Sequence, residues 1–191
     1  IAVFSWIVYG RVFGFNFFHD DLYLARPLAQ WKFLDHSATG FFWRPLWTWF
    51  MSAEYEWFGL HPVPMHAVNL ALHVIAAWLA YGLLARLGVT RLVALGTVCL
   101  WSLFGGNAYV VAWISAVNDP IALILLLAAT WVWVTVPADE APSPPRALLA
   151  TALWFLSMLS KEVSLAWPVA MAAVWFVRSR RARRPVTTGA G

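Results

Sequence analysis

The feature that most limits how this chain can fold is a series of long apolar runs with almost no charged side chains. Residues 64–85 and 120–137 contain no Asp, Glu, Lys or Arg. A helix needs about 20 such residues to cross the bilayer core. Over all 191 residues, 62% are hydrophobic and 12% are charged, whereas about 25% are charged in a soluble domain. This excludes a soluble globule, a disordered chain and a fibrous repeat, and it indicates a membrane protein that crosses the bilayer several times.

We therefore expect an all-α, polytopic transmembrane helix bundle with about six spans. The expected spans are residues 1–17, 64–85, 92–104, 119–136, 147–159 and 163–177. The last two are each short, and we predict two antiparallel helices that meet at residues 160–162. A long first loop, residues 18–63, is rich in aromatic side chains, which favour the membrane–water boundary. Within it, we expect a helix near residues 42–58 that lies along the outer leaflet or dips into it.

Basic side chains predict which way the spans face. Arg86 and Arg91 flank one turn, Arg146 precedes the fifth span, and five arginines follow the sixth. If the spans alternate, all three groups lie on one side, which the positive-inside rule identifies as the cytoplasm. We expect residues 1–178 to form the membrane domain and 179–191 a basic cytoplasmic tail, at a bacterial inner membrane. The net charge of +4 then indicates contact with membrane lipids and no nucleic-acid partner.

The opposite, extracytoplasmic side collects most of the acidic, His and Asn side chains. Asp20 and Asp21 directly follow the first expected span. One of these carboxylates could be a general base that takes a proton from an acceptor hydroxyl. It could equally cap the N-terminus of a helix. The local sequence leaves both interpretations open.

His66, Asn69 and His73 share one helix face at spacings i, i+3 and i+7. Hydrogen bonds between helices fit this spacing better than a shared metal ion, because two turns separate the histidines by roughly 10 Å. Such bonds could still shape a ligand pocket. The sequence identifies no metal ligands and no certain cofactor, although a divalent cation is compatible with the acidic pair.

Arg44 and Lys161 are the extracytoplasmic cations best suited to a lipid-linked phosphate. Arginine binds phosphate through two parallel N–H groups, and lysine acts as a point charge. Arg44 could instead extend to lipid headgroups, and Lys161 with Glu162 could form a solvated turn. Asp119 is expected to cap the helix that Pro120 opens.

The order of these motifs resembles that of GT-C-type membrane glycosyltransferases. It is most similar to the O-mannosyltransferase-like proteins that carry tetratricopeptide repeats, although this chain contains no such repeat. The resemblance covers about residues 13–177. The motifs in chain order are Asp-Asp at 20–21, Trp-Arg-Pro-Leu at 43–46, the His66/Asn69/His73 face, Ala-Trp-Ile-Ser at 112–115 and Ser-Lys-Glu at 160–162.

The resemblance implies transfer of a sugar from a polyprenyl-phosphate donor to a hydroxyl of an acceptor protein or glycan. It also implies that Asp20 is the general base, with Asp21 supporting it, and that Arg44 and Lys161 contact the donor phosphate. The other substrate-binding candidates are Glu162, Asp119, His66, Asn69 and His73.

Two positions that are charged in the family are neutral here. Tyr109 stands where the family has Glu, and Val117 stands where it has Arg. These neutral positions keep open a non-catalytic membrane scaffold. A transporter or lipid flippase is the other alternative, in which the same polar residues would line a pathway. A transport path would place charges through the whole bilayer depth, whereas the strong charges here gather at one face. That distribution favours the glycosyltransferase.

Overall fold

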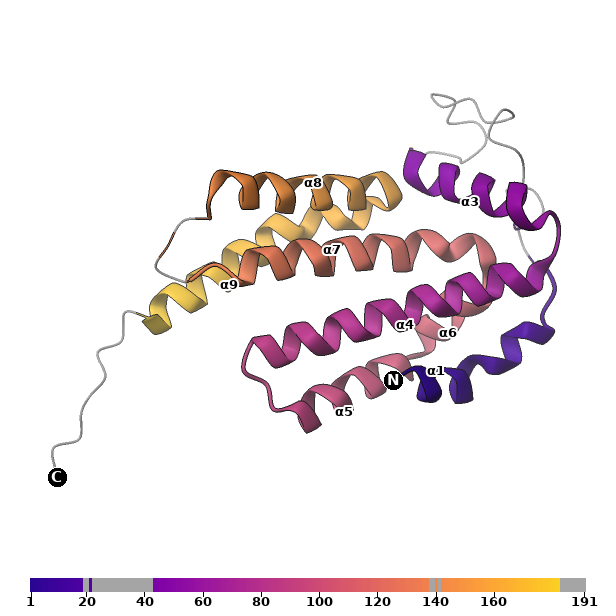
Figure 1. Ribbon diagram of the computed structural model, residues 1–191, viewed down its shortest axis with the longest axis horizontal. Helices are drawn as coiled ribbons and strands as arrows, with labels where there is room; N and C mark the ends of the chain where they lie inside the picture. The colour runs from indigo at the N-terminus through magenta and orange to yellow at the C-terminus, as the bar shows by residue number, and fades with distance from the viewer. Residues whose placement is uncertain (19–20, 22–42, 138–139, 141, 183–191) are drawn as a thin grey trace, which may run out of the picture.

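A computed structural model describes residues 1–18, 21, 43–137, 140 and 142–182, and this part of the chain is helical with no strand. The helices form one bundle (Figure 1). The all-α prediction is therefore confirmed for the described residues. The elements are α1 (Ala2–Tyr9), η1 (Gly10–Gly14), α3 (Pro45–Phe58), α4 (Pro62–Arg86), α5 (Arg91–Ser102), α6 (Gly105–Ala112), η3 (Ile114–Val117), α7 (Asn118–Val134), α8 (Pro144–Ser160), η4 (Glu162–Ala166) and α9 (Trp167–Ala182).

Two of the described helical segments are long and apolar enough to cross a membrane. They are α4 and the segment Ile114–Val134, which joins η3 to α7, and they match the expected spans at 64–85 and 119–136. A third crossing results if α5 and α6, which are bent by 63° at their junction, act as one broken span. The apolar helices Ala2–Gly14 and Glu162–Phe176 are shorter. The structure thus supports two or three spans.

Glycines explain where the expected spans are interrupted. At Gly10 the first helix changes to a 3₁₀ turn that ends at Gly14, so it stops short of residue 17. The expected span at 92–104 ends at Ser102, and a new helix begins at Gly105 in a different direction. Phe104 lies between them in an extended conformation. The break lies directly before Gly105 and Gly106, and glycine is a poor helix former, which disfavours one continuous helix here.

The helix α7 occupies the centre of the bundle, with α4 on one side and α8 on the other (Figure 1). Hydroxyl groups join α8 to α7, since Ser157 Oγ donates to the Ala122 carbonyl at 2.8 Å and Ser160 Oγ to the Asn118 carbonyl at 3.0 Å. On the other side, Gly82 of α4 faces the indole ring of Trp131. Small residues and hydroxyls of this kind let membrane helices approach closely.

The helix ends lie at the two ends of the bundle in the order that alternating spans predict. In Figure 1, the α4–α5 turn, the end of α7, the start of α8 and the end of α9 lie toward one end of the bundle. The α3–α4, α6–α7 and α8–α9 connections lie toward the other end, which we call the polar end. The predicted antiparallel pair at 147–159 and 163–177 is present as α8 and α9. The expected helix near 42–58 is present as α3, while α9 continues past residue 178 to Ala182.

We predict that Gly82→Leu destabilises the bundle. A Cβ atom at Gly82 would lie 2.9 Å from two ring carbons of Trp131, and overpacking of this kind costs about 1–3 kcal/mol. The thermal unfolding temperature of the purified protein in detergent should fall.

Gly96→Leu on α5 is the matched control, because a Cβ at Gly96 meets no atom within 4 Å. Equal unfolding temperatures for the two variants would contradict this account of α4–α7 packing.

Candidate functional site

The candidate site is built around the turn η3, which lies at the polar end between α6 and α7. Its four residues are almost completely buried, with exposed fractions between 0% and 4%. A short buried turn leaves peptide N–H and C=O groups without partners, and each unpaired group costs free energy. Side chains from three distant segments bind these groups here.

Asp21, Trp47 and Asn69 each bind the backbone of this turn. The Ser115 N–H donates to Asp21 Oδ1 at 2.8 Å, and Trp47 Nε1 donates to the Ser115 carbonyl at 2.8 Å. Asn69 Nδ2 donates to the carbonyls of Trp113 and Ile114 at 3.1 and 3.3 Å. Three motifs of the sequence therefore meet at one turn, together with Trp47, which directly follows the Trp-Arg-Pro-Leu motif. Asn69 makes the bonds between elements that its position predicted.

Asp21 is completely buried, and the Phe18 N–H donates to its second oxygen at 3.2 Å. Both carboxylate oxygens thus accept hydrogen bonds from backbone N–H groups, an arrangement that stabilises the ionised carboxylate. The geometry makes Asp21 an anchor between the end of the first helical segment and η3. Asp20, the predicted base, lies outside the described residues.

Two ion pairs bring the predicted cations and acids together at the same end. Arg44 donates from Nε and one terminal nitrogen to the two Glu162 oxygens, at 2.8 and 2.6 Å. The hydrogen bond from Arg44 holds the pKa of Glu162 below its usual value. Lys161 Nζ pairs with Asp119 Oδ1 at 2.5 Å. Each cation predicted to contact phosphate is therefore neutralised by a carboxylate.

The prediction that Asp119 caps a helix is wrong. The helix α7 begins at Asn118, its N-cap position is Val117, and no side chain among the described residues caps it. Asp119 lies inside the first turn, where its carboxylate binds Lys161 and still benefits from the positive end of the helix dipole. Lys161 and Glu162 do lie at a turn, and Glu162 is half exposed, but both side chains are paired with residues from other segments.

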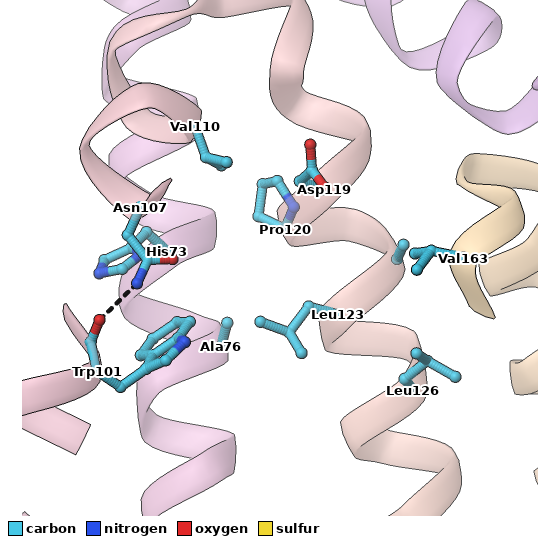
Figure 2. A pocket seen from close by; sticks show the side chains of 11 residues that line it. His73, Ala76, Trp101, Asn107, Val110, Asp119, Pro120, Leu123, Leu126 and Val163 are labelled. Carbon is cyan, nitrogen blue, oxygen red and sulfur yellow. Dashed lines mark hydrogen bonds between the residues drawn. The ribbon is translucent and has the colours of Figure 1, made fainter. Parts of the chain in front are cut away.

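His73 lines a pocket of about 250 Å³ between α4, α5, α6, α7 and η4. Its ring stacks on Trp101 with centroids 5.0 Å apart, and Tyr9 meets it edge-on at 5.2 Å. In Figure 2, His73, Trp101 and Asn107 form one wall, opposite Pro120, Leu123 and Leu126. The remaining lining residues are Ala76, Val110, Asp119, Ala122 and Val163.

His66, about two turns earlier on the same helix face, is not among the residues that line this pocket. It is completely buried, with the ring of Phe15 edge-on at 6.5 Å. The three residues of the shared helix face therefore have different roles. His66 makes an aromatic contact, Asn69 binds backbone carbonyls at η3, and His73 lines the pocket. Among the described residues, no group of three His, Cys, Asp or Glu side chains could hold a metal ion.

Glu54 of α3 is a residue that the sequence reasoning missed. The residue is 2% exposed, and within the part of the chain that the structure describes neither carboxylate oxygen has a hydrogen-bond partner. Burial, and secondarily the charge of Asp21, raise the pKa of Glu54 to about 8. The sequence did contain a signal, because Glu54 follows the buried Trp47 and Met51 at helical spacing and so shares their face.

In comparisons with known proteins, no family model, curated protein or solved structure matches the chain. The motif order described above therefore stays a resemblance.

We predict that Glu54 makes stability fall as the pH rises. Its pKa is raised from 4.5 to about 8 in the folded protein, so the folded state binds this proton more tightly than the unfolded chain does. The resulting stabilisation is complete below about pH 4.5 and is lost as the pH rises through about 8. Glu54→Gln is neutral at every pH, so the unfolding temperature of the wild type should fall more steeply between these pH values than that of the variant.

Glu56→Gln on the exposed face of the same helix is the control and should follow the wild type. Identical pH dependence of the wild type and Glu54→Gln would show that Glu54 is not held in its neutral form.

Proposed function

We propose that this chain is the membrane domain of a glycosyltransferase that moves a sugar from a polyprenyl-phosphate donor to an acceptor hydroxyl. One observation carries the proposal: polar side chains that are far apart in the sequence lie together around the start of α7. They are Asp21, Asn69, Arg44 and Lys161. Cations at one end of a membrane bundle suit a lipid-linked phosphate, because arginine and lysine both bind phosphate oxygens.

The chemistry assigned to these residues is an in-line displacement. Asp20 accepts the proton of the acceptor hydroxyl while the acceptor oxygen bonds to the anomeric carbon. The bond from that carbon to the phosphate oxygen breaks, and the lipid phosphate leaves with its electron pair. Arg44 or Lys161 stabilises the charge that develops on the leaving phosphate. Asp21 fixes the start of the loop through its bonds to Ser115 and Phe18.

The membrane arrangement is part of the same proposal. We propose six spans, with α1–η1, α5–α6, α8 and α9 completing the set begun by α4 and α7. The polar end faces the periplasm or exterior, and the Arg-rich connections face the cytoplasm of a bacterial inner membrane. The long first loop and α3 then lie at the outer boundary, where their aromatic rings are stabilised.

We predict that Asp20→Asn lowers sugar transfer at least about 100-fold, the usual contribution of a general base. Membranes that contain the protein are supplied with polyprenyl-phosphate sugars carrying a radiolabel, and label in the acceptor fraction is measured. Asp21→Asn should lower activity together with the unfolding temperature, because it removes the anchor on η3.

Glu140→Gln, in the connection at the opposite end, is the control and should retain full activity. Full activity of a double Asp20→Asn, Asp21→Asn variant would contradict the proposal. So would movement of labelled lipid across the bilayer without sugar transfer, which is the outcome expected of a transporter or flippase.

A further inference from the structure

The two ion pairs at the polar end leave no net charge among their four members. Arg44 meets Glu162 through two parallel N–H···O bonds, and Lys161 meets Asp119 through one. An arginine binds a phosphate with the same paired geometry that it uses for a carboxylate. Each carboxylate therefore occupies the place on its cation that a phosphate oxygen would take.

The two partners of the Arg44–Glu162 pair differ in their access to the surroundings. The Arg44 side chain is 15% exposed, whereas that of Glu162 is 49% exposed. Glu162 can thus leave the pair outward while the guanidinium stays in place. Glu162 also lies at the start of the 3₁₀ turn η4, next to Lys161, so one short segment supplies a member of each pair.

The donor and the product of the proposed reaction differ in charge. A polyprenyl-phosphate sugar is a phosphodiester with one negative charge. The polyprenyl phosphate left after transfer is a monoester, whose second ionisation near pH 6 gives it about −1.5 to −2 charges at neutral pH. Two cations without carboxylate partners would hold the product more tightly than the donor and would slow its release.

We propose that Glu162 and Asp119 set the selectivity of this cation pair, favouring a monoanionic phosphodiester over a dianionic phosphate monoester. This inference rests on the proposed function and gives the two acids a role within it. By offsetting part of the positive charge, they reduce the attraction for a dianion more than that for a monoanion, since Coulomb energy scales with the charge of the ligand. Both are positioning residues, because they act through Arg44 and Lys161.

The test measures binding of two soluble probes to the purified chain in phosphatidylcholine nanodiscs. Farnesyl phosphate represents the monoester, farnesyl methyl phosphate the diester, and farnesol is the uncharged reference. Glu162→Gln should tighten binding of farnesyl phosphate about fivefold, the upper range for a partly exposed pair, and binding of the diester clearly less. Asp119→Asn should shift the ratio of monoester to diester affinity in the same direction, and it leaves the Arg44–Glu162 pair intact.

Glu56→Gln, which removes an exposed acid from α3 outside the pairs, is the matched control and should leave the ratio unchanged. If the two acids had a purely structural role, their removal would weaken binding of both probes together. An unchanged ratio of monoester to diester affinity in both variants therefore overturns this inference. Binding of both phosphate probes by the wild type would in that case still support the phosphate site. If the wild type and all variants bind neither phosphate better than farnesol, the proposed function fails as well.

Discussion

The buried turn η3 is the constraint on which the rest of the structure depends. Its peptide groups have left water, and a short turn cannot pair them internally as a helix does. Asp21, Trp47 and Asn69 supply the missing donors and acceptors from three other segments. Removal of one of these side chains leaves a buried polar group unpaired, which costs about 1–3 kcal/mol. The first helical segment, α3 and α4 are therefore held to the same point.

The hydrogen bonds at η3 also fix the start of α7, and the start of α7 in turn positions the charged groups at the polar end. Ser160 binds the Asn118 carbonyl, so the end of α8 is held beside the first turn of α7. Lys161 and Glu162 follow directly and reach Asp119 and Arg44. Charged side chains are costly near the membrane core unless they are paired. The fold pairs them by bringing α3, α7 and η4 together.

The sequence predicted the two long helices and the gathering of polar residues at one end, because both follow from simple patterns. Apolar length is enough to recognise α4 and α7, and alternation of spans is enough to sort the connections. It did not predict the pairing of Arg44 with Glu162, because these residues are 118 positions apart. It also misjudged Asp119, where the local capping pattern was overridden by a partner from another helix.

The charge of Asp21 and the raised pKa of Glu54 are linked. Asp21 accepts N–H groups as a carboxylate, and its negative charge strengthens those bonds. That same charge contributes to the raised pKa of Glu54, after burial. An ionised Glu54 would set a second negative charge against Asp21 in a region of low dielectric constant, where like charges repel strongly. Keeping Glu54 protonated therefore avoids this repulsion beside the buried carboxylate that binds Ser115.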